Sequence, residues 1–262
     1  MHAETIFCVE IDEHIAKLLD NLRPITLEQM QEIRLMNRTD TKFVTDKDKL
    51  MKLLRLIQDE YFVQTTGGSR VANYKTVYWD TEDYRFYLEH HNRRLPRQKV
   101  RVRTYINSKK SFLEVKTKNN HGRTQKERMG LPSEEIIRDK RNEEFLRSMV
   151  QLEWEDLRPT VWNEFHRITL VNYGKTERLT IDFDVQFHNM ETGRQATTGP
   201  LVVIELKRNR RTTSPITGLL RQLHIMPSGF SKYCIGSVMT NEHLKRNLFK
   251  KKMVKLDKII NN

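Results

Sequence analysis

The spacing of apolar residues near the start of the chain predicts two short helical pieces. Apolar side chains recur at helical spacing over residues 11–22, and Pro24 ends this segment because proline cannot continue a helix. Thr26 and Gln29 then have the spacing of a capping box, in which each side chain bonds the backbone N–H of the other residue. Residues 10–36 are therefore expected to be helical in two pieces.

The period of the pattern changes after residue 60. Residues 46–60 still place Leu50, Leu54 and Ile57 on one helical face, whereas from Tyr61 onward apolar and polar residues alternate as in strands. The alternation predicts strands at 61–66, 74–79, 84–89, 99–106, 111–118, 123–129, 163–171, 177–187, 201–207 and 232–238. Further helices are predicted at 133–151, at 211–223 and, as a basic amphipathic helix, at 241–260.

Many strands with helices around them predict an α+β protein built on an antiparallel sheet or barrel. Residues 1–262 are expected to form a single domain. Its parts would be a helical N-terminal segment over 10–60, a strand-rich body over about 61–240 and a C-terminal helix over 241–260.

Several predicted strands carry charged side chains on one face and apolar side chains on the other. The charged faces hold Lys99, Arg101 and Arg103; Glu114, Lys116 and Lys118; Arg178, Asp182 and Asp184; and Glu205 and Lys207. One interpretation is an ordinary sheet with a solvated face, in which the two aspartates are ion-pair partners of arginine. The other is a barrel whose interior is lined by charge. Period alone does not decide between them.

The second interpretation needs a ligand. Rows of Lys and Arg inside a barrel repel one another unless an anion neutralises them, and a phosphate chain is such an anion. Carboxylates among these cations would then suit a divalent metal, because hard cations prefer oxygen ligands.

Composition agrees with a polyanionic partner without identifying it. The chain has 47 Lys and Arg residues against 34 Asp and Glu residues, a net charge of +13. Cys8 and Cys234 are the only cysteines, which predicts neither a disulfide framework nor a zinc site. The sequence shows no signal peptide pattern, no long apolar segment and no Walker loop, so a cytoplasmic protein is expected.

An ordered set of short motifs is more specific than any of these features. The motifs are DTKFV at 40–44, YWDT at 78–81, HHN at 90–92, KVRVR at 99–103, FLEVK at 112–116, GRTQK at 122–126, Arg167, RLTID at 178–182, VIELK at 203–207 and FSKY at 230–233. In this order they resemble the polyphosphate-polymerase domain of the vacuolar transporter chaperone (VTC) family over about residues 25–240. The resemblance implies the fold of the triphosphate tunnel metalloenzymes, which include the CYTH proteins: an eight-stranded antiparallel tunnel barrel with inward-facing charge.

The resemblance also implies an activity and a set of site residues. The family polymerase uses Mn²⁺ or Mg²⁺ to move the γ-phosphate of ATP onto a polyphosphate chain. The positions implied in catalysis are Lys42, Arg101, Arg103, Lys116, Arg167 and Lys232. Further phosphate-binding positions are His90, Lys118, Lys126, Arg128, Arg178, Lys207 and Ser231, and the metal candidates are Glu205 and Glu114. His90 stands where the eukaryotic polymerase has an arginine, so charge at this position depends on pH.

Other functions fit the same tunnel. A triphosphatase would use water as the attacking group, and a polyphosphate-binding sensor would not turn its ligand over. Nucleic acid is the less favoured partner, because the aromatic residues alternate along strands as core residues do. Eukaryotic relatives carry an SPX sensor domain and membrane segments; neither is seen in this sequence, so a stand-alone prokaryotic type with a separate membrane partner is expected.

Overall fold

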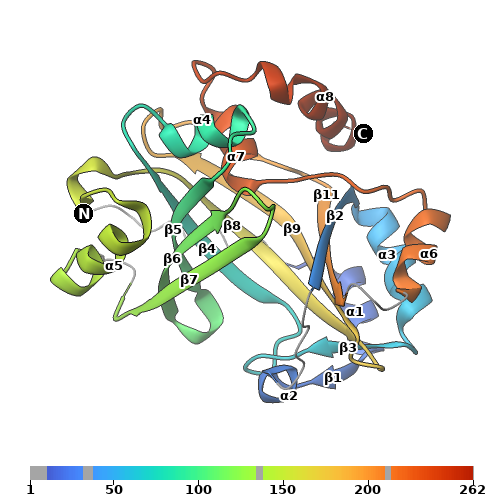
Figure 1. The fold of residues 1–262 in the computed structure, drawn as a ribbon. Helices are drawn as coiled ribbons and strands as arrows, with labels where there is room; N and C mark the ends of the chain where they lie inside the picture. The colour runs from blue at the N-terminus through green and yellow to red at the C-terminus, as the bar shows by residue number, and fades with distance from the viewer. Residues whose placement is uncertain (1–10, 32–37, 134–137, 210–213, 262) are drawn as a thin grey trace.

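The computed structural model describes residues 11–31, 38–133, 138–209 and 214–261. Its strands form one large sheet in which the long strands follow the order β2-β11-β9-β8-β4-β5-β6-β7, all paired antiparallel (Figure 1). These strands are β2 (Arg38–Asp46), β4 (Ala72–Asp80), β5 (Arg97–Tyr105), β6 (Lys110–Lys118), β7 (Thr124–Leu131), β8 (Arg158–Asn172), β9 (Glu177–Asn189) and β11 (Leu201–Asn209). The predicted α+β class and antiparallel sheet are therefore confirmed.

Short strands extend this sheet, and helices surround it. The short strands are β1 (Arg23–Ile25), β3 (Tyr61–Gln64) and β10 (Gln195–Thr197). The helices are α1 (Glu13–Asp20), α2 (Leu27–Gln31), α3 (Lys47–Ile57), α4 (Arg85–His91), α5 (Lys140–Val150), α6 (Pro215–Gln222), α7 (Lys232–Thr240) and α8 (Lys250–Ile260), with 3₁₀ turns η1 (Ile106–Ser108), η2 (Trp154–Asp156) and η3 (Asn247–Phe249). None of these helices has the length and apolar character that a membrane-spanning helix needs.

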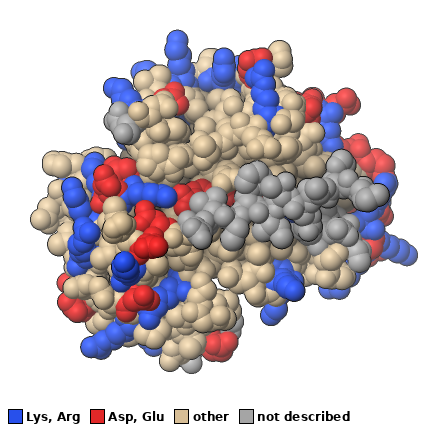
Figure 2. All heavy atoms as spheres, turned by 180° about the vertical axis from the view of Figure 1, so that it is seen from behind, with Lys and Arg blue, Asp and Glu red and all other residues tan. Residues whose placement is uncertain are grey.

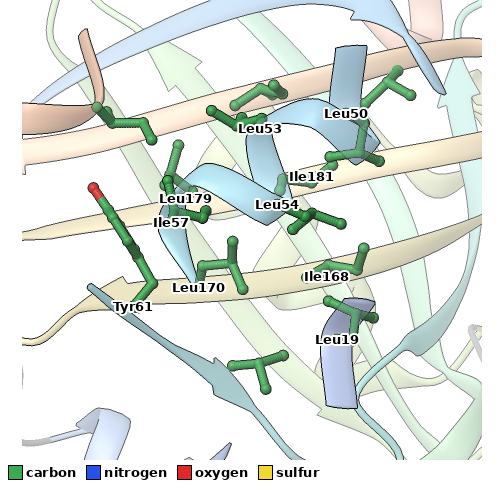
Figure 3. Packing of buried hydrophobic residues seen from close by; sticks show 14 of the residues in the cluster. Leu19, Leu50, Leu53, Leu54, Ile57, Tyr61, Ile168, Leu170, Leu179 and Ile181 are labelled. Atoms are coloured by element: carbon green, nitrogen blue, oxygen red, sulfur yellow. The ribbon is translucent and has the colours of Figure 1, made fainter. Parts of the chain in front are cut away.

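The apolar faces of the strands point outward, under the helices. Leu54 and Ile57 of α3 pack on Ile168 of β8 and Ile181 of β9, with α1 and α6 completing the same cluster (Figure 3). Helix α5 covers β5 and β6 in the same way through Leu146. Because a helix stripe and a strand face can bury apolar area only against each other, the alternate charged faces must turn inward.

The sheet is curved enough to bring its distant strands together. Lys116 on β6 and Lys207 on β11 lie within electrostatic range of each other, although several strands separate them in the sheet order. The curvature does not close the hydrogen-bonded ladder: β2 and β7 are the two ends of the order and do not pair with each other. The edge of β2 is met instead by the chain after α6, where Ser228 N–H donates to the Lys42 carbonyl over 2.8 Å.

A bulge in β9 divides the interior into a polar half and an apolar half. Before the bulge Thr180 and Asp182 face inward; at Asp184 the backbone takes a φ of 51°, and the register with β8 shifts. After the shift Val185 and Phe187 face inward instead. Helix α7 packs on this apolar half, with its Gly236 directly against the Phe187 ring. One half of the interior is thus filled by a helix, and the other keeps its charge.

Local side-chain signals explain where helices α2 and α3 begin. The predicted capping box is confirmed, since Thr26 N–H donates to Gln29 Oε1 over 2.9 Å and Gln29 N–H donates to Thr26 Oγ1 over 3.3 Å. The carboxylate of Asp46 caps α3 by accepting from Lys49 N–H over 2.8 Å.

Two predicted strands are wrong. Residues 84–89 fall in α4, whose first N–H groups are held by the Asp80 carboxylate and the Thr81 hydroxyl. Residues 232–238 form α7, which is buried on nearly every side and therefore has no helical stripe for a period to reveal.

Other boundaries also differ from the predictions. The structure also has strands β1, β2 and β10 where none is predicted, so the expected helical segment 10–60 contains two strands. Residues 241–249 precede the C-terminal helix α8 rather than belong to it. Helix α5 begins only at Lys140. The expected helical positions 10, 32–36, 134–137 and 211–213 lie outside the described residues.

The contact between α7 and β9 can be tested at Gly236. A Cβ added there would lie 2.4 Å from Phe187 Cδ1, so Gly236→Ala is expected to lower the free energy of unfolding by about 1 to 3 kcal/mol. Gly218→Ala is the matched control, because Gly218 is also helical and meets no atom within 4 Å. Urea denaturation of both variants measures the difference; equal stability of the two would contradict the packing of α7 in the interior.

Candidate functional site

Three carboxylates on the inner face are each shared by two basic side chains. Glu114 on β6 accepts two hydrogen bonds at Oε2 from Arg101, over 2.8 Å from Nε and 2.6 Å from Nη2. Lys126 on β7 donates to Oε1 over 3.0 Å. Burial alone would raise the pKa of Glu114, but Arg101 and Arg103 hold it well below its usual range. Glu114 therefore stays charged as the counter-ion of this pair.

Asp182 on β9 is the second shared carboxylate. The guanidinium of Arg167 on β8 donates two hydrogen bonds to it, over 2.6 Å from Nε to Oδ1 and 2.8 Å from Nη2 to Oδ2. Lys232, the first residue of α7, donates to the same Oδ2. Burial lowers the pKa of Lys232 to about 7, and the positive charge of Arg167 acts in the same direction against the pull of Asp182.

Glu205 on β11 is the third, and it is the most accessible of the three. It accepts from Lys42 on the neighbouring strand β2, and Lys207 Nζ lies 3.4 Å from its other oxygen. Burial lowers the pKa of Lys42 to about 8, with Lys207 adding to the effect. The Glu205 side chain keeps 21% of its surface exposed, whereas Glu114 keeps none and Asp182 only 6%.

An aromatic stack supports three of the inward cations. The rings of Tyr74 on β4 and Phe165 on β8 stack with centroids 5.2 Å apart. Lys232 Nζ lies 3.9 Å above the Phe165 ring, while the guanidinium carbons of Arg167 and Arg103 lie 4.9 Å and 5.5 Å from the Tyr74 ring. The negative ring faces attract these cations without neutralising them.

Two basic side chains in this interior have no carboxylate partner among the described residues. Arg103 donates to Thr76 Oγ1 over 3.3 Å, and burial together with the neighbouring arginines lowers its pKa to about 10. Lys116 faces Arg101, and this charge, with burial and Arg103, lowers the pKa of Lys116 well below its usual range. The six side chains predicted for catalysis therefore converge on one interior with more positive than negative charge.

The other predicted phosphate-binding residues lie around this centre. Lys126 and Lys207 belong to the shared pairs already described. Lys118 and Ser231 lie toward the end where α4 and α7 meet the sheet, and His90 lies on α4 itself. Burial and the nearby lysines and arginines lower the pKa of His90 far below its usual range, so the imidazole is neutral.

Two predicted positions lie apart from the centre. Arg128 is exposed on the edge strand β7, with its guanidinium 4.7 Å from the Phe112 ring. Arg178 on β9 turns toward the opposite end of the molecule, where it donates to the Met30 carbonyl over 3.2 Å. Asp184, expected as a partner of arginine, pairs with Lys47 over 2.7 Å.

A buried carboxylate on β4 fixes the helix that carries Lys232. Asp80 has no exposed surface and accepts from the backbone N–H groups of Thr81, Phe86 and Tyr87 at the start of α4. It also accepts from the hydroxyl of Tyr233 on α7. Asp80 thus joins α4 and α7, and it sets the position of the lysine next to Tyr233.

The carboxylates of this site fit a divalent metal only if other ligands complete its coordination. Within the described ranges, no three His, Cys, Asp or Glu side chains gather in a way that could hold a metal ion alone. Both oxygens of Glu114 are bonded to cations, whereas Glu205 is partly exposed and bound by flexible lysines. One carboxylate completed by phosphate oxygens and water is a usual environment for Mg²⁺, so Glu205 fits a metal that arrives with a phosphate chain.

Sequence reasoning missed the residues that support the site. Tyr74, Phe165 and Asp80 are not among the sequence candidates. Aromatic residues at alternating positions have the same pattern in a core and under a cation, so the pattern does not mark Tyr74 and Phe165. Asp80 and Tyr233 did stand inside two of the ordered motifs, which was the one signal pointing to them.

Comparison with known proteins shows the family of the chain and a similar fold. The family model of the VTC domain matches residues 37–241. The fold is similar to that of HpAC1 from Hippeastrum, a protein proposed as an adenylyl cyclase and found to have a dominant triphosphatase activity: TM-score 0.52, 14% identity, 78% of this chain and 97% of that chain covered. The PH1819 protein from Pyrococcus horikoshii OT3 gives a TM-score of 0.42 at 12% identity, with 83% of this chain and 99% of that chain covered. No curated protein matches the chain in sequence.

The link between Asp80 and Tyr233 predicts a measurable effect. Tyr233→Phe removes a donor from a buried carboxylate, so the free energy of unfolding is expected to fall by about 1 to 3 kcal/mol, and tripolyphosphate binding should weaken as Lys232 loses its position. Tyr87→Phe is the control, since its hydroxyl donates only to the Lys245 carbonyl. Calorimetric titration of both variants checks the prediction; unchanged tripolyphosphate affinity in Tyr233→Phe would show that Lys232 does not depend on this link.

The lowered pKa of Lys232 predicts proton uptake on anion binding. Below a pH of about 7 the amine is charged, and above it the amine is largely neutral. A phosphate beside it favours the charged form and raises this pKa, so binding at about pH 8 should take up protons, and binding below about pH 6 should not. Calorimetry of tripolyphosphate binding in buffers of different ionisation enthalpy measures the uptake. Lys232→Met should abolish this component; equal uptake in that variant would assign it elsewhere.

Proposed function

Because the chain belongs to the VTC domain family, we propose that it is a metal-dependent polyphosphate polymerase that transfers the γ-phosphate of ATP to a polyphosphate chain. Family membership supports a function on polyphosphate or triphosphate. The observation that carries the proposal is the surplus of buried positive charge: three carboxylates are each shared by two cations, and Arg103 and Lys116 remain without one among the described residues. A triphosphate would neutralise this surplus.

The proposed roles follow from position and chemistry. Arg101, Arg103 and Arg167 grip phosphate oxygens, since a planar guanidinium can bond two oxygens at once. Lys116 lies beside them as a point charge, and Lys42 and Lys232 neutralise charge near the transfer point. Lys126 and Lys207 hold the carboxylates Glu114 and Glu205 in place until the ligand arrives.

The proposed reaction is an in-line displacement. A terminal oxygen of the polyphosphate chain attacks the γ-phosphorus of ATP, the bond from that phosphorus to the β–γ bridging oxygen breaks, and ADP leaves with that oxygen. The chain grows by one phosphate. No covalent protein intermediate is needed, because positioning and charge neutralisation supply most of the catalysis in phosphoryl transfer.

Glu205 is the proposed metal ligand. Enzymes of the tunnel fold generally depend on a divalent metal, and Glu205 is the shared carboxylate with exposed surface. A bound Mn²⁺ or Mg²⁺ would neutralise charge on the phosphate oxygens. A role for Glu114 as a second metal ligand stays a prediction, because both of its oxygens already accept hydrogen bonds. The cytoplasmic location and the separate membrane partner also stay predictions.

A triphosphatase is the second candidate. The tunnel-fold protein from Hippeastrum is described as having a dominant triphosphatase activity, and the same cations would hold a triphosphate while water attacks it. The two activities differ in the attacking group, so only a product assay separates them. A polyphosphate-binding sensor would show tight binding and no turnover.

The decisive assay supplies γ-labelled ATP, Mn²⁺ and a short polyphosphate primer. A ladder of labelled chains is expected for the polymerase. Labelled free phosphate without chains would identify the triphosphatase, and no movement of label with tight binding would identify the sensor.

The role of Glu205 can be tested in the same assay. Glu205→Gln is expected to reduce turnover at least 100-fold, since removing one element of charge stabilisation in a transition state costs about 2.7 to 4 kcal/mol. Tripolyphosphate binding without metal should persist or tighten, because Lys42 and Lys207 are released from their counter-ion. The control Glu89→Gln changes the same group on α4, where Glu89 pairs with Arg85. Full activity in Glu205→Gln would exclude this residue as the metal ligand.

A further inference from the structure

A second group of basic side chains lies where α4, α7 and α8 meet the ends of β5 and β6. This α8-end cluster consists of Arg97 and Lys99 on β5, Lys118 on β6 and Lys252 on α8. Arg97 and Lys118 are direct cross-strand partners, two residue pairs beyond Lys99 and Lys116. The cluster is thus continuous with the central site but lies closer to the helices.

The α8-end cluster has no counter-ion within the described part of the chain. None of its four members forms an ion pair there, and the charges that act most strongly on His90 are Lys99, Arg97, Lys252 and Lys118. Lys99 also stands directly opposite Lys116. Like charges opposite each other on neighbouring strands are destabilising, so this arrangement has an energetic cost that an anion would remove.

Two neutral polar residues, Ser231 and His90, lie beside these cations. Ser231 Oγ lies 2.8 Å from Lys99 Nζ and is the N-cap of α7, so the positive end of that helix points here. The Nδ1 atom of His90 is buried and has no hydrogen-bond partner among the described residues. A buried ring nitrogen without a partner is costly, and a phosphate oxygen or its proton would satisfy it.

Helix α8 brings the fourth cation. Phe249, Met253 and Leu256 pack it against α7 and the sheet, and this packing places Lys252 over the chain at Gly229. A Cβ on Gly229 would lie 3.5 Å from Lys252 Nζ, an ordinary van der Waals distance, so this amine lies directly beside the backbone at Gly229. Lys252 is half-buried, whereas Lys255 on the same helix is exposed. Residues 242–262, which include α8, lie beyond the match to the family domain.

We propose that Lys252 of α8, together with Lys99, Ser231 and His90, forms an additional phosphate subsite. It binds one phosphate group of a chain longer than the triphosphate held by the central cations, and so α8 retains long chains. The proposal rests on the proposed function for the identity of the chain. The shared chemistry is a phosphate oxygen anion, which a polyphosphate chain or free orthophosphate can supply.

Binding without metal or nucleotide tests the subsite separately from catalysis. Lys252→Gln is expected to weaken long-chain polyphosphate binding roughly tenfold, the effect of losing one charge-assisted contact, and to change tripolyphosphate binding by less than about twofold. Lys255→Gln removes the same charge from the exposed face of α8 and should leave both affinities unchanged. Equal long-chain affinity in Lys252→Gln and the parent protein would overturn the proposal, whatever the protein catalyses.

A second variant separates binding from folding. Lys99→Gln relieves repulsion from Lys116, so its thermal stability should equal or exceed that of the parent protein while long-chain binding weakens. Loss of both stability and binding would instead indicate a structural lysine. Titration with orthophosphate, followed by the NMR signal of the His90 imidazole, identifies the source of the phosphate: a response to long chains alone supports chain retention, and saturation by orthophosphate alone would overturn it.

Discussion

Inside the curved sheet, carboxylates are shared between pairs of basic side chains, and other cations have no carboxylate beside them among the described residues. Burying like charges costs free energy, and the protein offsets this cost in two ways. The outer faces of the same strands bury leucine, isoleucine and valine under α1, α3, α5 and α6. Arg103, which has no carboxylate partner among the described residues, lies over the Tyr74 ring, and Lys232 lies over the Phe165 ring. Burial of apolar side chains on the outer faces of the strands therefore stabilises a fold whose interior is charged.

The rear surface shows the other side of this division of charge. In Figure 2, Lys and Arg lie scattered among Asp and Glu on the described part of that face, without a continuous basic stripe. The basic residues that act together are the inward ones, such as Arg101, Arg103 and Lys116. A net charge counted along the sequence contained no information about this separation, because it sums residues without regard to the face on which they lie.

Alternation along the strands predicted which residues share a face, and the ordered motifs predicted that the charged face is the inner one. The first statement depends on local spacing, which a sequence records directly, and the second on the resemblance to a known family. The pairing of Glu114 with Arg101 and Lys126, and of Asp182 with Arg167 and Lys232, depends on register between strands that are far apart in the chain. Helix α7 was mistaken for a strand for a related reason: its burial is set by β9 and α4, and its own residues carry no stripe. What the sequence could not supply was the identity of partners across the fold.

The open edge between β2 and β7 has a consequence for the width of the interior. In a fully closed barrel, strand number and stagger fix the radius, and any change of radius must break backbone hydrogen bonds. Here the ladder ends at β2 on one side and β7 on the other, and the chain at Ser228 lies against β2. The width of the interior is therefore set by side-chain packing and charge rather than by a closed ring of backbone hydrogen bonds. The width of the interior can therefore change. An anion that binds inside can draw the two halves of the sheet together without breaking backbone hydrogen bonds between strands.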